Sequence, residues 1–275
     1  MKPSSKLAVG GACAALAISA GAFANPHPLP FSYPYQTLPR GKVEVEEIAD
    51  LVPMRVTREK LDGTQDAVTA VRSELQTELE IGVTPRLELG LYFDFKQGAT
   101  ADTPALRFGG VKQRLRYRFA EEGDLPIDMG VYFELAEFYN ELEIEEKLLL
   151  SRRFGNLTTV CNLWVEQEYY FQDQQWKLIY NPTLGATYEI SPSFMLGVEY
   201  WAHGRFDKAA PVAGQDNTEN PSGARHYVGP AFMLQSGEAW WSVGAYARVD
   251  HLGEALAAED PYGKVWIRTM VGMGF

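Results

Sequence analysis

The chain has 275 residues, of which 46% are hydrophobic and 22% charged, and its formal net charge is −11. This balance excludes a disordered chain, and the acidity argues against a nucleic-acid binder, which would carry a basic surface. Beyond the first 24 residues no apolar run reaches the roughly 18 residues that a membrane helix needs, so the hydrophobic residues are dispersed.

The first 24 residues have the pattern of a bacterial secretory signal peptide. Two lysines give a positive start, an uncharged Ala/Gly-rich stretch follows, and residues 22–24 (Ala-Phe-Ala) form a small-residue cleavage site. We therefore expect cleavage after Ala24 and export to the cell envelope. The exported chain would keep one cysteine, Cys161, so we expect no intramolecular disulfide.

Residues 25–41 (NPHPLPFSYPYQTLPRG) carry five prolines. Proline lacks a backbone donor and disfavours both helix and central strand, so this segment is predicted to be an extended arm.

From residue 42 onward, apolar and polar residues alternate. In residues 86–96 (RLELGLYFDFK), positions 87, 89, 91, 93 and 95 are apolar, while Glu88, Asp94 and Lys96 fall on the other face. A helix would spread these two sets around its circumference, whereas a strand separates them. The pattern predicts twelve strands, near residues 43–56, 68–83, 86–96, 108–119, 125–138, 143–154, 157–170, 176–190, 193–204, 225–235, 239–250 and 262–275.

The strand lengths and connections favour a membrane barrel over a soluble sandwich. The predicted strands have about 11–15 residues, whereas soluble strands usually have about 5–6 and tilted membrane strands need about 9–11. Short connections such as residues 84–85 and 155–156 alternate with connections that include long ones, such as residues 97–107 and 205–224. Outer-membrane barrels have short periplasmic turns, longer outer loops and an even strand number. We therefore predict an all-β, transmembrane, antiparallel up-and-down barrel of about 12 strands, with both termini in the periplasm.

The last strand places Val271, Met273 and Phe275 at alternate positions. A terminal Phe preceded by this apolar alternation resembles the signal read by the outer-membrane barrel assembly machinery. The segments LPRGKVEVEE (38–47), SELQTELEIGVTPRLELGLYFDF (73–95) and the closing VGMGF extend the resemblance. Together they resemble a poorly characterised group of proteobacterial outer-membrane β-barrel proteins that are usually described only as porins or transporters. The resemblance implies the fold and the location, but no substrate and no catalytic residue.

The charges on the predicted inner face are arranged in columns. The acidic residues Glu74, Glu78, Glu80, Glu88 and Asp94 come from the second and third strands, the basic residues Lys112, Arg114, Arg116 and Arg118 from the fourth, and Asp128 and Glu134 from the fifth. One interpretation is a lattice of ion pairs that ties neighbouring strands together. The other is a transverse field across a water-filled pore that orients charged solutes.

Tyr132, Trp164 and Trp201 are also predicted to face the lumen, where they would form either a stacking path for solutes or simple packing. We expect no enzyme, because no Ser lies two residues from a His and no G-x-S-x-G motif is present. His203 and His226 border the longest predicted loop together with acidic residues, yet without a metal-ligand spacing, so no metal and no cofactor are expected.

The chain is therefore divided into a signal peptide (1–24), a Pro-rich arm (25–41) and a barrel (42–275). We expect the arm to be a periplasmic tail, with insertion into the barrel as a plug as the alternative. The leading functional hypothesis is a narrow passive channel for small hydrophilic or charged solutes. The alternatives are a closed structural or binding barrel that contacts lipopolysaccharide or a partner and, ranked third, a lipid hydrolase. The expected partners are outer-membrane lipid, lipopolysaccharide, the assembly machinery and small solutes, without nucleic acid.

Overall fold

The computed structural model describes residues 24–98, 106–172, 174–206 and 224–275, except for positions 251, 254, 255, 257–259 and 261. The predicted signal peptide up to residue 23 and most of the longest loop thus lie outside the described residues. No helix in the described part of the chain is long and apolar enough to cross a membrane.

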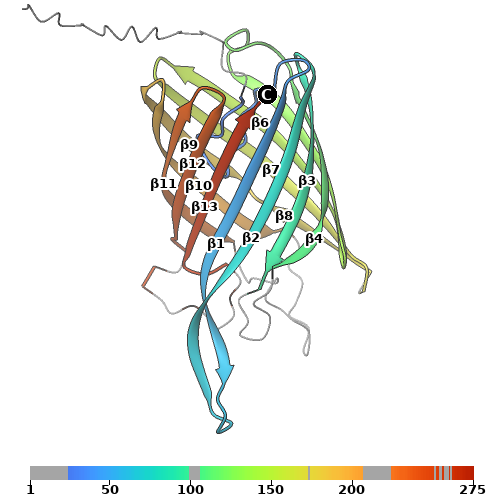
Figure 1. Ribbon diagram of the computed structural model, residues 1–275, viewed down its shortest axis with the longest axis vertical. Coiled ribbons are helices and arrows are strands. Elements are labelled where there is room, and N and C mark those ends of the chain that lie inside the picture. Colours follow the sequence, from blue (N-terminus) through green and yellow to red (C-terminus); the bar gives the residue numbers. More distant parts are fainter. Residues whose placement is uncertain are drawn as a thin grey trace, which may run out of the picture.

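The described chain forms strands that wind into a single barrel (Figure 1). They are β1 (Val43–Glu59), β2 (Gln65–Thr84), β3 (Leu87–Gln97), β4 (Arg107–Arg118), β5 (Asp128–Phe138), β6 (Glu141–Phe154), β7 (Leu157–Tyr170), β8 (Gln175–Tyr180), β9 (Thr183–Ser191), β10 (Phe194–Arg205), β11 (Arg225–Ser236), β12 (Ala239–Arg248) and β13 (Val265–Gly274).

The barrel is closed and antiparallel throughout. Strand β13 pairs with β1, with Gly274 opposite Glu44 and Ile267 opposite Leu51, which leaves the sheet without an edge. Strands β8 and β9 both lie between β7 and β10, so they are two halves of one strand. The interruption falls at Asn181 and Pro182, because proline cannot donate to a ladder. The predicted twelve-stranded antiparallel barrel is confirmed, with the expected strand 176–190 broken at this point.

The two faces of the sheet have opposite polarity. On β3, Leu89 is 41% exposed on the outside, whereas Glu88 and Asp94 are fully buried inside. A soluble barrel would bury the apolar set instead. An apolar outer band around a polar interior is the arrangement of a barrel that faces lipid.

The two ends of the barrel differ. The turns at residues 85–86, 155–156, 192–193 and 237–238 lie at the end that carries the C-terminus, at the top of Figure 1. The strand ends that flank the connections 98–106, 206–224 and 249–264 lie at the opposite end, where the β1–β2 hairpin also extends beyond the barrel (Figure 1). The connection 119–127, also at the C-terminal end, is longer than the short turn expected there, and the other connections follow the alternation that the sequence indicates. We call these the short-turn end and the long-loop end.

The Pro-rich arm lies inside the barrel, not outside it. His27, Leu29, Phe31, Tyr35 and Leu38 are at most 6% exposed, although residues 24–40 contribute to no strand. The expectation of a periplasmic tail is therefore wrong, and the alternative of a plug describes the structure. The physical reason is that the arm carries large apolar side chains, which a tail outside the barrel would expose to water.

Candidate functional site

The lumen is the candidate site, and the arm divides it. Phe31 of the arm stacks on Trp201 at 4.5 Å between ring centroids and meets Tyr246 and Trp266 edge-on at 5.1 and 5.9 Å. Trp201 in turn stacks on Tyr227 at 4.2 Å, with the two rings nearly parallel. These rings form one buried cluster in the lumen, to which the arm and four strands contribute large aromatic side chains.

Wall side chains take the place of a neighbouring strand for the arm. Backbone N–H groups that are buried must find an acceptor. A Pro-rich extended segment does not pair its own N–H and C=O groups as a helix does, so the acceptors must come from elsewhere. The arm donates from Asn25 N–H to Glu44 (2.7 Å), Phe31 N–H to Glu199 (3.1 Å), Tyr33 N–H to Asn162 Oδ1 (2.7 Å) and Leu38 N–H to Glu88 (2.6 Å). The polar wall is therefore fitted to this segment along its length.

The predicted basic column on β4 meets acidic partners from β2, β3 and β5. Arg114 donates to Glu78 and Glu88 at 2.8 Å each and also bonds Glu80, and all four side chains are buried. Arg116 binds Glu88, reaches Glu80 at 3.5 Å and lies 3.4 Å from the Pro34 carbonyl of the arm. Lys112 lies 3.3 Å from Glu134. These contacts are those of the ion-pair lattice.

The remaining predicted charges lie outside this lattice. The pairs are Glu74 with Arg72 (3.9 Å), Asp94 with Lys96 (3.6 Å), Arg118 with Glu121 (2.7 Å), and Asp128 with the backbone N–H of Gly123 (2.7 Å). All four predicted residues face inward or lie at a rim, but they make local contacts and do not form one continuous column.

The predicted lumen aromatics fall into two groups. Tyr132 meets Tyr33 of the arm at 4.9 Å, and the Lys147 ammonium lies 3.8 Å from the Tyr132 ring and 3.7 Å from the Trp164 ring. Trp201 belongs to the separate cluster around Phe31. Trp164 and Trp201 both line the second cavity described below, whereas Tyr132 does not, so the three rings do not line one common path.

Sequence analysis missed several residues that the arm uses. Glu199, Asn162 and Lys147 all face the lumen and touch arm residues. Their inward position follows from strand alternation, so it was available from the sequence. Their contacts with the arm could not be predicted from the sequence, because these contacts depend on where the arm lies.

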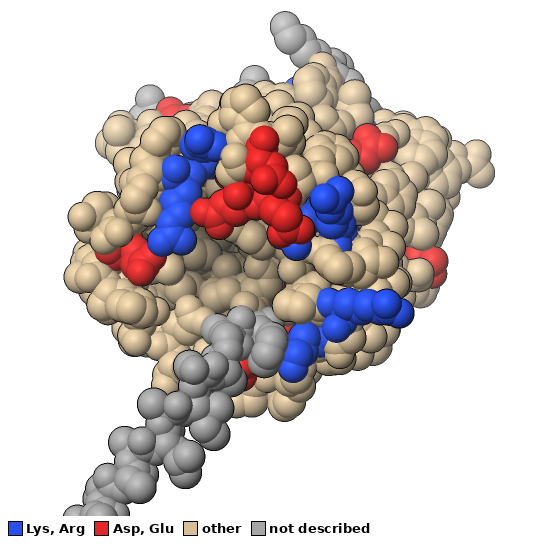
Figure 2. All heavy atoms as spheres, turned by 90° about the horizontal axis from the view of Figure 1, so that it is seen from above, with Lys and Arg blue, Asp and Glu red and all other residues tan. Residues whose placement is uncertain are grey.

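Two cavities flank the arm. The one at the short-turn end has a volume of about 560 Å³ and is lined by Leu29, Ser32 and Leu38 of the arm. Figure 2 shows this end of the molecule, hollowed at its centre and bordered by side chains of both charges. The other cavity, of about 290 Å³, is lined by Phe31 together with Trp201 and Trp266. The neighbouring residues Phe31 and Ser32 therefore face different cavities, and the arm is the partition between them.

The second cavity is acidic. Its lining includes seven acidic side chains against four from Lys and Arg, which leaves an excess of negative charge. The acidic ones are Asp50, Glu74, Glu141, Glu143, Glu145, Glu166 and Glu168, and the basic ones are Arg72, Lys96, Lys112 and Arg268. A cavity with this balance attracts cations and repels anions.

Both ring nitrogens of His203, which borders the longest loop, have partners. His203 contacts Asn181 through Nδ1 at 2.5 Å and Tyr262 through Nε2 at 2.6 Å. Both ring nitrogens are thus occupied by an amide and a phenol, with no serine in either position. The acidic residues of the adjoining loop, 207–223, lie outside the described residues.

Val271, Met273 and Phe275 face outward, each about half exposed or more. The Phe275 backbone N–H donates to the Val43 carbonyl at 2.7 Å, so the C-terminus is joined to the first strand. The three predicted assembly-signal residues therefore lie at the seam where the barrel closes.

No protein-family model and no curated protein matches the chain. Among solved structures, it is similar to the COG4313 outer membrane channel from Pseudomonas putida F1, with a TM-score of 0.58, 12% identity, and 88% of this chain and 98% of that chain covered. It is also similar to the NanC porin, with a TM-score of 0.52, 8% identity, and 83% of this chain and 98% of that chain covered. The fold is therefore that of channel-type transmembrane β-barrels.

Proposed function

We propose that the chain is an outer-membrane channel for small hydrophilic or charged solutes, and that its arm holds the lumen closed in the described state. The observation that carries the proposal is the partition. Two cavities, one of mixed polarity toward the short-turn end and an acidic one toward the long-loop end, are separated by a segment that belongs to no strand.

The arm can leave without opening the barrel wall. Its buried backbone donors bind wall side chains, so displacement breaks those hydrogen bonds and aromatic contacts while every strand pairing is kept. Each such hydrogen bond contributes about 0.5–1.5 kcal/mol net, and more where the acceptor is charged. In a displaced arm, water would take the place of these hydrogen-bond partners. Movement of the arm out of the lumen is therefore energetically accessible.

The acidic cavity supports a preference for cations. Net negative charge at a narrow entrance concentrates counter-ions and excludes co-ions. The predicted lumen charges on β2 to β5 stabilise the wall by pairing with one another. The excess of acidic over basic side chains in the second cavity, on β6 and β7, provides the selectivity.

The proposal includes the steps that bring the barrel to this location. The signal peptide is cleaved after Ala24, the assembly machinery reads Val271, Met273 and Phe275, and the outer band contacts membrane lipid and lipopolysaccharide. It assigns no catalytic residue. The apolar outer band and the outward position of these three residues support it.

Planar-bilayer recording tests the function. The intact chain is compared with a variant that lacks residues 27–36 and with a control that lacks the exposed hairpin tip at residues 60–64. We expect low or intermittent conductance from the intact chain and the control, and steady conductance from the arm deletion. Equal conductance in all three would show that the arm does not occlude the lumen.

One observation favours the second candidate, a closed structural or binding barrel. The Phe31 cluster joins the arm to β10, β11, β12 and β13 through a continuous set of buried rings. If neither the intact chain nor the arm deletion conducts at any salt concentration, the channel proposal fails and this candidate replaces it.

A further inference from the structure

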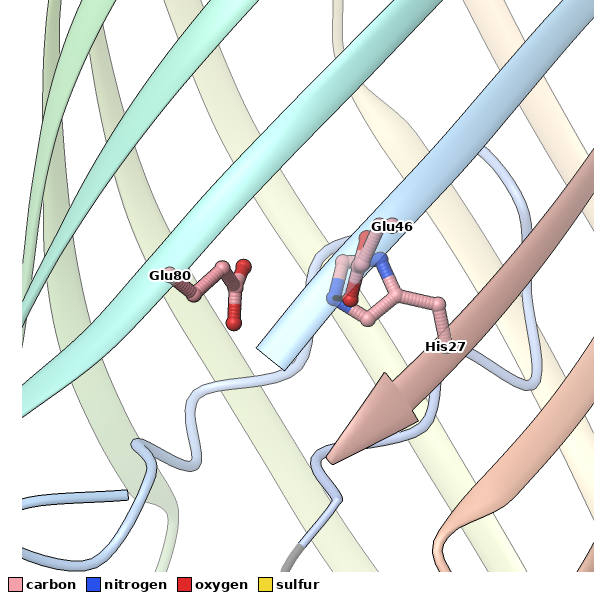
Figure 3. A group of neighbouring side chains, drawn as sticks. All are labelled: His27, Glu46 and Glu80. Carbon is pink, nitrogen blue, oxygen red and sulfur yellow. Dashed lines mark ion pairs between the residues drawn. The ribbon is translucent and has the colours of Figure 1, made fainter. Parts of the chain in front are cut away.

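Three ionisable side chains meet where the arm crosses β1 and β2 near the short-turn end. His27 comes from the arm, Glu46 from β1 and Glu80 from β2 (Figure 3). One ligand atom from each lies within 4.8 Å of the other two, and the three residues are at most 1% exposed. Figure 3 shows the imidazole lying against the Glu46 carboxylate, with Glu80 projecting from the neighbouring strand.

The atoms that face each other here lack hydrogen-bond partners among the described residues. These are His27 Nε2, both carboxylate oxygens of Glu46, and Glu80 Oε2, of which only Glu80 Oε2 has an ion-pair contact with an arginine, 3.5 Å from the Arg116 guanidinium. The distance from His27 Nε2 to Glu46 Oε1 is 3.8 Å, which is too long for a hydrogen bond. Leaving a fully buried carboxylate without any partner is costly, so this arrangement calls for a species that is not part of the polypeptide.

The local charge balance requires the same species to be positive. Five buried carboxylates surround the site, while the ion-paired cations among them are Arg114 and Arg116. The carboxylates are Glu44, Glu46, Glu78, Glu80 and Glu88. Both arginines bind Glu80 and Glu88, and neither reaches Glu46. The excess negative charge is therefore concentrated at Glu46.

The ring of His27 is held in place to act as a ligand. It stacks on Trp240 at 5.6 Å with an angle of 13° between the planes, and meets Tyr33 edge-on at 5.3 Å. These contacts fix the direction of Nε2 toward Glu46. A ligand held in this way loses little freedom on binding, which favours a specific ion over diffuse counter-ions.

We propose that His27, Glu46 and Glu80 bind one divalent transition-metal ion of the Zn²⁺ type. Imidazole and carboxylate ligands lie about 2.0–2.2 Å from Zn²⁺, so two ligands of one ion stand about 3–4 Å apart, in agreement with the separation of His27 and Glu46. A nitrogen ligand also favours a transition metal over Ca²⁺ and Mg²⁺, which prefer all-oxygen sites. The ion would join the arm to two strands of the wall and fasten the plug.

Metal retention by the full-length barrel tests the site. The chain is produced without a polyhistidine tag, isolated from membranes, stripped with a chelator, loaded with Zn²⁺ and dialysed before its metal content is measured. The variants are Glu46→Gln and His27→Gln, which keep size and polarity. The matched control is Glu143→Gln, a buried lumen glutamate of the other acidic group, on β6. Folding is checked for each chain by the mobility shift between unheated and heated samples.

The expected result is one Zn²⁺ per chain for the unaltered barrel and for Glu143→Gln. Both site variants should weaken Zn²⁺ binding by more than about 10-fold. Co²⁺ in place of Zn²⁺ should give a visible absorption band that His27→Gln removes.

A barrel that retains no Zn²⁺ would overturn the proposal and leave a proton shared between Glu46 and Glu80 as the explanation. Retention that survives Glu46→Gln, or that Glu143→Gln abolishes, would overturn it as well. The test needs no conductance, so its failure is distinct from failure of the channel function. His27 lies outside the sheet, so His27→Gln still tests the proposal if Glu46→Gln, in the barrel wall, does not fold.

Discussion

Phe31 of the arm stacks on Trp201 of β10 at 4.5 Å, although the two residues are far apart in the chain. Glu199, two residues before Trp201 on the same face, accepts the Phe31 backbone N–H at 3.1 Å. One short stretch of β10 thus holds both the ring and the backbone of the residue at the centre of the plug.

Replacing Phe31 with Ala should loosen the plug. Truncating a buried Phe costs about 3–5 kcal/mol in a protein core, and here the loss falls on the docked arm because the barrel wall keeps its pairings. We expect a higher open probability in single-channel recordings, with little change in barrel stability. The control is Phe93→Ala, which removes an equal ring from the outer face of β3. An unchanged open probability for Phe31→Ala would mean that this ring does not hold the plug.

A disulfide between arm and wall should have the opposite effect. Ser32 Oγ donates to Thr183 Oγ1 at 2.8 Å, so cysteines at both positions place their sulfur atoms within bonding reach. In a Cys161→Ser background, the double variant Ser32→Cys, Thr183→Cys should conduct only after reduction. The single Ser32→Cys variant is the control and should show no response to reductant. Full conductance of the oxidised double variant would rule out arm movement as the gate.

Replacing Arg114 with Met should destabilise the barrel strongly. Its guanidinium serves Glu78, Glu80 and Glu88, and removing one partner of a buried ionic group costs about 3–5 kcal/mol. The comparison is Arg153→Met at the rim, where the partner Glu189 is 2.8 Å away and the arginine is 48% exposed, so the loss should be at most about 1 kcal/mol. Denaturant unfolding in lipid vesicles measures both. Similar losses for the two variants would contradict the importance of the buried lattice.

The sequence was sufficient for the barrel and insufficient for the plug. Strict alternation on β3 and its neighbours specifies which side chains face inward, because a one-residue shift would reverse every side chain. The arm carries no such constraint. Its prolines suit an exposed tail and a buried segment equally, and the useful signal was the set of large apolar residues at alternate positions, such as Leu29, Phe31 and Tyr33.

The metal-ligand set could not be found by spacing. His27, Glu46 and Glu80 stand on three separate segments and converge only when β1 and β2 pair around the arm. Familiar ligand motifs depend on short separations within one helix or loop. The charge columns of β2 to β4 were visible in advance, yet the excess of carboxylates over arginines has meaning only once all of them are known to be buried.

Charge reversal on β6 and β7 should alter ion selectivity in a channel opened by deletion of residues 27–36. Glu143 and Glu166 line the acidic cavity, and each lies in a group of buried or half-buried carboxylates, so Lys at these positions removes the excess negative charge. We expect the reversal potential in a salt gradient to shift from cation-selective toward anion-selective, and more strongly at low salt, where charges are screened less. Glu189→Lys, at the rim of the other end, is the control and should shift it little. Equal shifts for the cavity and rim variants would place the selectivity of the channel outside this cavity.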